Sequence, residues 1–357
     1  VIAQDVKQLL RLLLSFQLSV PSSLIDITVM AYGFKGAGRL TLPALADSLL
    51  SRPLETRDDV IGKGAKRLLF SEISSQTMGD MLITEAETLE ILWKKIAQDQ
   101  QAHDESQVSL YNDVDGPLIA VLAHMEHRGA LLDLPLLRAQ SQQMATQLST
   151  LNQHAYALAG QEFNTASVKQ LQSILFDSLG LPVLEKTPKG DPSTSESALA
   201  VLGQQFPLPK TILEIRSLTK LKSTYIDALP LLSYEGRVHC SFQQTVTATG
   251  RLSCQNPNLQ NIPIRTDNGR AVRRAFIAPE GFKLVSFDYS QIELRIMAHI
   301  SKDQTLTSAF LLDEDVHSAT AGEIFSMPVA EVGPAERRVA KIINFGLIYG
   351  MSAFGLA

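Results

Sequence analysis

Glu336–Gly350 reads ERRVAKIINFGLIYG, and a four-residue step through it picks out Arg337, Lys341, Phe345 and Tyr349. On an α-helix each step turns about 400°, so the four side chains drift only about 120° and form one stripe about 18 Å long. A charge pair is usually a solvated face and an aromatic pair is usually core, so this stripe suits neither environment. It suits a ligand with an anionic tail and a flat head, because Lys and Arg bind phosphates and aromatic rings stack on bases. A nucleoside triphosphate has that shape.

Residues 282–299 read FKLVSFDYSQIELRIMAH and combine a short strand pattern with a helix pattern. We expect the strand to end at Asp288, where a carboxylate faces the crevice in which ligands and metals commonly sit. A hard oxygen ligand suits Mg²⁺, which proteins usually hold with one or two carboxylates and substrate phosphates. The alternative is structural, because Ser290 to Glu293 has the form of a capping box and Asp288 would favour a helix N-terminus.

A third stretch, residues 247–276, reads TATGRLSCQNPNLQNIPIRTDNGRAVRRAF. Arg makes bidentate phosphate contacts, and Asn and Gln amides reach base and sugar edges. Any single arginine here is typical of an ordinary surface loop, but the cluster favours nucleic acid. The cluster comprises Arg251, Arg265, Arg270, Arg273 and Arg274 with Asn258, Gln260 and Asn261.

Composition and charge agree with this interpretation. The chain has 357 residues, of which 45% are hydrophobic, enough for two or three domains. The net charge is −5, yet residues 209–274 carry ten Lys and Arg against four Asp and Glu, a local charge of +6. A basic segment inside an acidic chain indicates an anionic partner that the net charge hides. There is no apolar run of about 18 residues, so we expect no membrane span.

The coarse pattern of elements is mostly helical. Apolar spacing predicts long helices over residues 117–159 with a break at Arg128-Gly129, and helices again from Gln291 onward. Capping boxes predict helix starts at Ser167 and Ser193. The stretch RVHCSFQQTV, residues 237–246, predicts a strand.

Four motifs, TGRLS, PNLQNIP, DYSQIELR and RRVAKIINFGLIYG, follow one another along the chain. In order and spacing they resemble the family A DNA polymerases, the bacterial members in particular. QEFNTASVKQLQ and KLKSTY are similar to the thumb of that family, so the resemblance covers nearly the whole chain. It implies an α+β fold with a right-hand polymerase architecture. The implied parts are an exonuclease-like α/β domain at 1–101, a linker at 102–116, the thumb and connecting helices at 117–235, a partial palm at 236–300 and partial fingers at 301–357.

The resemblance implies a two-metal site for nucleotidyl transfer. Asp288 would hold two Mg²⁺ ions with help from the Tyr289 carbonyl, to activate a primer 3′-hydroxyl and stabilise the leaving pyrophosphate. Arg337 and Lys341 are the implied catalytic cations, and His317 would help them to grip the triphosphate. The other implied nucleotide-binding residues are Ser290, Gln291, Ile292, Glu293 at the sugar 2′ position, and Phe345 and Tyr349 at the bases.

The resemblance also implies a surface for primer–template DNA. Arg251, Gln260 and Asn261 would meet its minor groove, and Asn258, Lys220 and Lys222 are further implied contacts. The partners are therefore DNA and deoxynucleoside triphosphates, and we expect a monomer that contacts no membrane. Only two cysteines, Cys240 and Cys254, occur, which indicates a reducing cytoplasm.

The chain departs from the family pattern in two places. Residues 1–101 align with the back half of the 3′–5′ exonuclease domain, but Leu9 stands where a metal-binding carboxylate is expected and Met81 where a tyrosine is expected. We expect this domain to lack proofreading activity and to serve as a packing scaffold. The family's second metal-binding motif, His-Asp-Glu, falls beyond Ala357, so we expect a fragment that binds DNA weakly and extends nothing.

Three functions stay open at this point. The leading one is template-directed DNA synthesis in replication or repair. The second is a nucleic-acid-binding fragment without catalysis. The third is a single-subunit RNA polymerase, against which Glu293 argues, because an enzyme that accepts ribose should not crowd the 2′ position.

Overall fold

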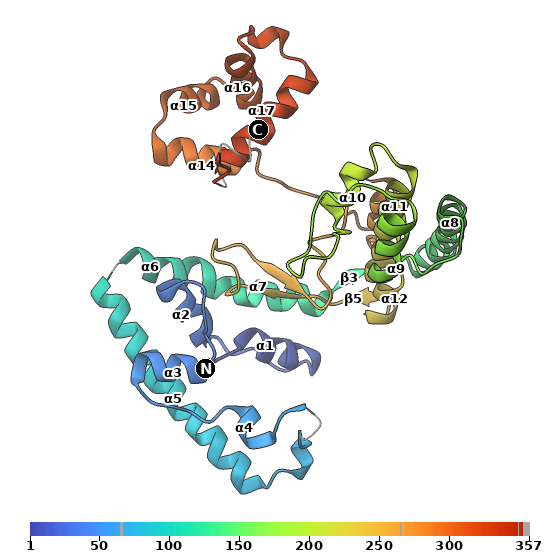
Figure 1. The fold of residues 1–357 in the computed structure, drawn as a ribbon. Helices are drawn as coiled ribbons and strands as arrows, with labels where there is room; N and C mark the ends of the chain where they lie inside the picture. Colours follow the sequence, from blue (N-terminus) through green and yellow to red (C-terminus); the bar gives the residue numbers. More distant parts are fainter. Residues whose placement is uncertain (65–66, 104, 265, 349, 353–357) are drawn as a thin grey trace. The chain divides into compact units, whose positions relative to one another are not determined.

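The computed structural model describes residues 1–64, 67–103, 105–264, 266–348 and 350–352, and it divides into two compact units, Val1–Lys283 and Leu284–Ala357. Within the first unit the N-terminal elements precede the long helix α8 (Figure 1). They are β1 (Ile2–Ala3), α1 (Val6–Ser15), β2 (Ile25–Asp26), α2 (Ile27–Lys35), α3 (Leu42–Leu50), α4 (Arg57–Ile61), η2 (Phe70–Glu72), α5 (Ser75–His103), α6 (Glu105–Leu110), η3 (Tyr111–Asp115) and α7 (Gly116–Arg128).

The rest of the first unit is built around two long helices, α8 and α11, that pack against each other. Its elements are β3 (Ala130–Leu131), α8 (Leu134–Ala159), α9 (Val168–Gln172), η4 (Ser173–Ser178), α10 (Glu196–Leu202), α11 (Pro207–Leu221), η5 (Lys222–Ile226), α12 (Ala228–Leu232), β4 (Ser233–Tyr234), β5 (Arg237–Val238), β6 (Ser241–Gln243), β7 (Ser253–Gln255) and α13 (Asp267–Arg274).

The strands that the structure describes in the first unit are short and form three small sheets. Strands β1 and β2 are parallel, β3–β5–β4 are antiparallel, and β6 pairs with β7 in an antiparallel hairpin. The predicted strand over residues 237–246 is therefore wrong as one element, since β5 and β6 belong to different sheets. The chain changes sheet at His239 and Cys240, which lie in neither strand.

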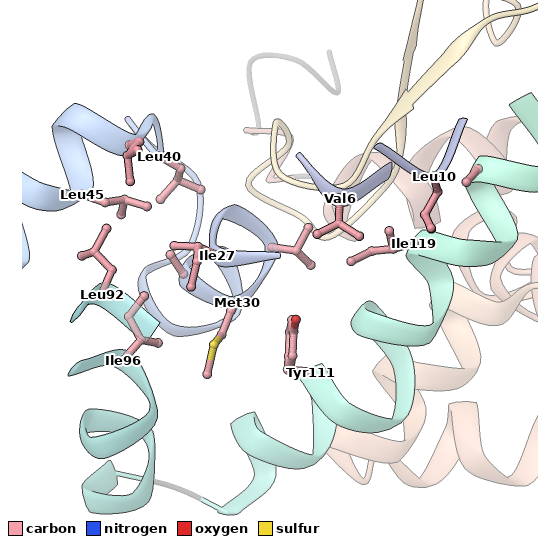
Figure 2. Packing of buried hydrophobic residues seen from close by; sticks show 14 residues of the cluster. Val6, Leu10, Ile27, Met30, Leu40, Leu45, Leu92, Ile96, Tyr111 and Ile119 are labelled. Carbon is pink, nitrogen blue, oxygen red and sulfur yellow. The ribbon is translucent and has the colours of Figure 1, made fainter. Parts of the chain in front are cut away.

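Apolar side chains of the N-terminal elements form one core (Figure 2). Helix α1 begins after Asp5, whose carboxylate accepts the Gln8 N–H, and its buried face carries Val6 and Leu10. Leu92 and Ile96 of α5 are fully buried in the same core. Burial of each such side chain stabilises the fold by about 1.5–3 kcal/mol. This apolar core therefore holds α1 and α5 in place.

Two predicted helix boundaries are confirmed and one is corrected. Helix α7 ends at Arg128, followed by Gly129 with a φ of 64°, and α9 begins after Ser167. Helix α10 begins after Ser195 instead of Ser193, because the Ser195 hydroxyl accepts the Ala198 N–H and so caps the helix.

The second unit is a helical cluster. It contains α14 (Ile292–Ser301), α15 (Gln304–Leu311), α16 (Val316–Phe325), η6 (Val329–Glu331) and α17 (Pro334–Ile348). Helix α16 packs along α17, and α14 packs against α15 through a small core that includes Leu294, Ala309 and Val316. Across the described part of the chain no helix is long and apolar enough to cross a membrane.

Candidate nucleotide and nucleic-acid site

Helix α17 carries the stripe that the sequence predicts. Arg337, Lys341 and Phe345 all lie within the helix, one turn apart. Tyr349, the fourth member, lies outside the described residues. The Lys341 ammonium is 6.0 Å from the centre of the Phe345 ring, so the cation and the ring are neighbours on one face. The predicted helix is confirmed, and the roles of its side chains remain predictions.

Asp315, which the sequence reasoning missed, joins α16 to α17. One carboxylate oxygen caps α16 by accepting the backbone N–H groups of His317 at 3.0 Å and Ser318 at 3.4 Å. The other accepts Nε of Arg337 at 2.5 Å. Burial raises the pKa of the Asp315 carboxyl, but the bonds from Arg337 and the His317 backbone outweigh burial and hold that pKa below its usual value. Asp315 thus stays ionised and fixes the Arg337 side chain.

His317 is buried, with 2% of its surface exposed. Its ring lies 5.7 Å from the Phe345 ring, centre to centre. Asn344 Nδ2 is 3.2 Å from Nδ1 of His317 and 3.0 Å from the Thr320 hydroxyl oxygen. That hydroxyl donates to the Val316 carbonyl, so it accepts from Asn344. The amide therefore presents N–H groups to both neighbours, and Nδ1 of His317 accepts.

An accepting Nδ1 places the proton of a neutral imidazole on Nε2. Burial lowers the pKa of His317, and the charges of Arg337 and Lys341 lower it further against the opposing effect of Asp315. The ring is therefore neutral at pH 7 and carries one N–H donor on Nε2. Lys341 and Arg337 of the α16–α17 pair can offer two cations to an anion, and the neutral His317 ring is buried next to them.

The segment around Asp288 differs from its prediction. Residues 282–290 form no strand, and residues 281–290 are all exposed, with 93% of the surface of Phe287 accessible. No strand among the described residues pairs with this segment, so the predicted strand is wrong. The predicted capping box is also wrong, because α14 begins at Ile292 after Gln291, which has a φ of 51° and makes no side-chain cap. The alternative explanation for Asp288, that it stabilises a helix N-terminus formed by a capping box at Ser290, therefore has no such capping box to support it.

The predicted metal-binding and nucleotide-binding residues of this segment lie partly in the exposed stretch and partly in α14. Asp288, Tyr289 and Ser290 are exposed, and Glu293 lies in the first turn of α14. Among the described residues no group of three or more His, Cys, Asp or Glu could hold a metal ion. Mg²⁺ needs only one or two carboxylates when phosphates supply other ligands. The accessible Asp288 carboxylate and Tyr289 carbonyl are adjacent hard oxygen donors and fit such an ion.

The first unit holds a cavity of about 1260 Å³ between α8, α11 and the segment 257–268. Three predicted DNA contacts, Lys220, Asn258 and Asn261, line it. The same cavity is lined by Thr146, Gln147, Thr150, Leu151, Glu196, Ala200, Leu213, Glu214, Arg216, Ser217, Leu218, Leu221, Thr224, Tyr225, Pro257, Pro263, Thr266 and Asn268. The structure thus brings half of the predicted DNA-binding set to one cavity.

The remaining predicted DNA contacts, Arg251, Gln260 and Lys222, are not among the residues that line this cavity. Arg251 and Gln260 are exposed, and the Gln260 amide donates to the Leu252 carbonyl at 3.0 Å. Lys222 lies 2.6 Å from the Asp227 carboxylate, with 19% of its side chain exposed. Lys222 is therefore the weakest candidate of the set for a phosphate contact.

The predicted nuclease positions lie on two helices of the N-terminal core. Leu9 is half-buried on α1, and Met81 is half-buried on α5. Glu85, one turn after Met81, accepts two bonds from the Arg57 guanidinium at 3.3 and 3.2 Å. The lack of proofreading and the domain boundaries remain predictions.

Comparison with known proteins places this geometry in a family. A model of DNA polymerase family A matches residues 135–357. The chain is 51% identical over 324 residues to DNA polymerase I of Pseudomonas aeruginosa, covering 90% of this chain and 35% of that protein. It is 44% identical over 335 residues to the thermostable DNA polymerase I of Thermus aquaticus, covering 93% of this chain and 39% of that protein.

A solved structure is similar as well. The polymerase domain of Pol1 from M. smegmatis, in complex with DNA primer-template and dNTP, superposes with a TM-score of 0.84 at 36% identity, covering 99% of this chain and 59% of that chain. The predicted fold class is thereby confirmed. The chain spans little more than a third of the length of the curated relatives it matches. On these similarities the chain belongs to DNA polymerase family A.

Proposed function

We propose that the protein containing this chain is a template-directed DNA polymerase that transfers deoxynucleotides to the 3′-hydroxyl of a primer. The observation that carries the proposal is the α16–α17 pair, in which Lys341 and the His317 ring lie beside the Phe345 ring and Asp315 fixes the Arg337 side chain. The named relatives are DNA polymerases I, and the solved relative is a complex with primer-template and dNTP. We propose the same partners here, and a monomer that acts in the cytoplasm.

The residues of α16 and α17 would bind the triphosphate. Lys341 is exposed and free to contact phosphate oxygens, whereas Arg337 is oriented by Asp315 and presents its remaining guanidinium N–H groups. His317 would donate through Nε2 while neutral. Phe345, whose ring lies against His317, would contact the sugar and base. Ion pairs with phosphate are short, charge-assisted hydrogen bonds and roughly twice as strong as neutral ones.

Asp288 and the Tyr289 carbonyl would hold Mg²⁺, as two ions in the complete enzyme. When bound, the ions favour deprotonation of the primer 3′-hydroxyl and neutralise charge on the leaving pyrophosphate. Glu293 follows these residues in the first turn of α14, and it would restrict the sugar 2′ position. That restriction selects deoxyribose and disfavours the RNA polymerase alternative.

The exposed residues of the first unit would bind the primer–template duplex. Arg251 lies in the loop between β6 and β7, Gln260 follows β7, and Asn258, Asn261 and Lys220 line the cavity of the first unit. A second function, nucleic-acid binding without catalysis, is favoured for residues 1–357 by one observation. The segment of Asp288 lacks strand partners among the described residues, so its carboxylate is not held in place.

Primer extension by the full-length gene product tests the proposal. A labelled primer on four templates that differ in the first templating base should gain only the complementary deoxynucleotide, and ribonucleotides should be incorporated at least about 100-fold less efficiently. Addition that ignores the template, or equal use of ribonucleotides, would overturn it. DNA binding with no extension under any divalent metal would favour the non-catalytic alternative.

A further inference from the structure

The loop between β6 and β7 is held by a tyrosine that lies more than 200 residues earlier in the chain. Tyr32, on α2, donates its hydroxyl hydrogen to the Thr247 carbonyl at 2.7 Å. The same hydroxyl oxygen accepts the Gly250 N–H at 3.1 Å. One side chain therefore bonds both ends of a four-residue turn.

This turn directly precedes Arg251, the first predicted DNA contact. The Thr247 hydroxyl donates to the Arg251 carbonyl at 2.6 Å, which closes the turn from inside. Gly250 has a φ of 77°, a left-handed conformation that favours glycine. With both ends of the turn fixed, the backbone from which the Arg251 side chain departs is fixed as well.

The base of the same hairpin is also held by the N-terminal elements. The Glu126 carboxylate, fully buried on α7, accepts Nζ of Lys7 at 2.6 Å and the Phe242 N–H at 2.6 Å. Lys7 also donates to the Phe242 carbonyl. Beyond β6, the Gln244 amide donates to the Asp115 carbonyl at 2.9 Å. Residues 1–128 thus contact β6 at its base and the loop at its far end.

We propose that Tyr32 is a positioning residue for primer–template binding, through which the exonuclease-like domain holds the Thr247–Gly250 turn and the Arg251 side chain in a binding-ready conformation. The inference rests on the proposed function. A loop that is already ordered does not lose conformational freedom on binding, so its contacts contribute more to affinity. The arrangement gives residues 1–101 a role that needs no nuclease chemistry.

Binding of a fluorescein-labelled primer–template to residues 1–357, followed by anisotropy, tests this role. Tyr32→Phe removes only the hydroxyl and should raise Kd about 3- to 10-fold, since two hydrogen bonds of modest net strength are lost. Tyr234→Phe is the matched control, because Tyr234 is 71% exposed on β4, and it should leave Kd unchanged. Thr247→Val removes the hydroxyl that donates to the Arg251 carbonyl without changing α2, and it should also raise Kd.

A double-mutant cycle separates positioning from a general loss of stability. Arg251→Ala should weaken binding, and adding Tyr32→Phe to it should cost much less than Tyr32→Phe costs alone. Additive effects, or an unchanged Kd for Tyr32→Phe, would overturn the positioning role while leaving the polymerase proposal intact. An unchanged Kd for Arg251→Ala would instead contradict the proposed DNA surface.

Discussion

Two regions of the second unit carry predicted site residues, and they are organised to different degrees. In the α16–α17 pair, Asp315 binds Arg337 and Asn344 binds the His317 ring. Around Asp288, residues 281–290 are exposed and pair with no described strand. The residues proposed to bind the triphosphate are held by packed helices, whereas those proposed to bind the metal are not.

The difference follows from how each region is stabilised. Helix spacing and an N-cap are local devices, because all their partners lie within a few residues or on the adjacent helix. A strand needs the N–H and C=O groups of another backbone, and an isolated strand has none. Local interactions alone can thus position residues on helices. A carboxylate at the end of a strand is positioned only when that strand pairs with distant residues.

Asp288→Asn should have the largest effect. In the full-length gene product we expect primer extension to fall by ~10³-fold or more, since a metal ligand is lost, with DNA affinity changed by less than about twofold. Asp313→Asn is the matched control, because Asp313 is exposed in the same unit and has a φ of 56°, which Asn tolerates. An active Asp288→Asn enzyme would show that the carboxylate is not needed as a metal ligand.

Asp26 provides the opposite case, a carboxylate that is fully fixed. It is 3% exposed and accepts the N–H groups of Val6, Thr28 and Val29 at 2.8, 2.9 and 3.1 Å. Burial nevertheless raises its pKa to about 6. A raised carboxyl pKa means that the folded chain binds the proton more tightly than the unfolded chain, so this stability is present below pH 4 and is lost as the pH rises to 6.

The folded state of the Asp26→Asn variant should therefore become more stable, relative to that of the wild type, as the pH rises. Between pH 4 and pH 7 we expect the difference in unfolding free energy between the two proteins to change by about 2–3 kcal/mol. Hydrogen exchange of amides in α1 and α2 measures it, after correction for intrinsic exchange rates. A difference that does not vary with pH would mean that Asp26 titrates normally in the folded chain.

Asn344→Asp should test whether the His317 tautomer is set by its neighbour. A carboxylate cannot donate to Nδ1, so it should draw a proton to Nδ1 and raise the imidazole pKa. Above that pKa, Nε2 would lose its proton, and we expect deoxynucleotide affinity about tenfold weaker at pH 8, with partial recovery at lower pH. Imidazole ¹⁵N shifts report the tautomer directly, and Asn112→Asp, at an exposed position on η3, is the control. A wild-type ring protonated on Nδ1 would contradict the assignment.

What the sequence predicted well was placed by local rules. The four-residue spacing of Arg337, Lys341 and Phe345 required only a helix, and α17 supplies it. The break after Arg128 required only a glycine with positive φ, and Gly129 supplies it.

What the sequence predicted poorly depended on distant partners. The KLVSFD pattern has the composition of a strand, but composition does not say which backbone pairs with it. Asp315 was missed although an Asp before an apolar helix start is an N-cap signal. Its bond to Arg337, and that of Tyr32 to Thr247, join segments that only the folded chain brings together.

The central claim is that α16 and α17 form a triphosphate site independently of Asp288. Nucleotide binding in the absence of divalent metal tests this claim most directly. Fluorescent dATP is titrated into residues 1–357 in EDTA. Lys341→Gln should weaken binding about tenfold through loss of a charge-assisted contact, whereas Asp288→Asn and the control Lys302→Gln should each change it by less than about twofold. Equal affinity for Lys341→Gln and the wild type would contradict the account, as would a loss in Asp288→Asn as large as that in Lys341→Gln.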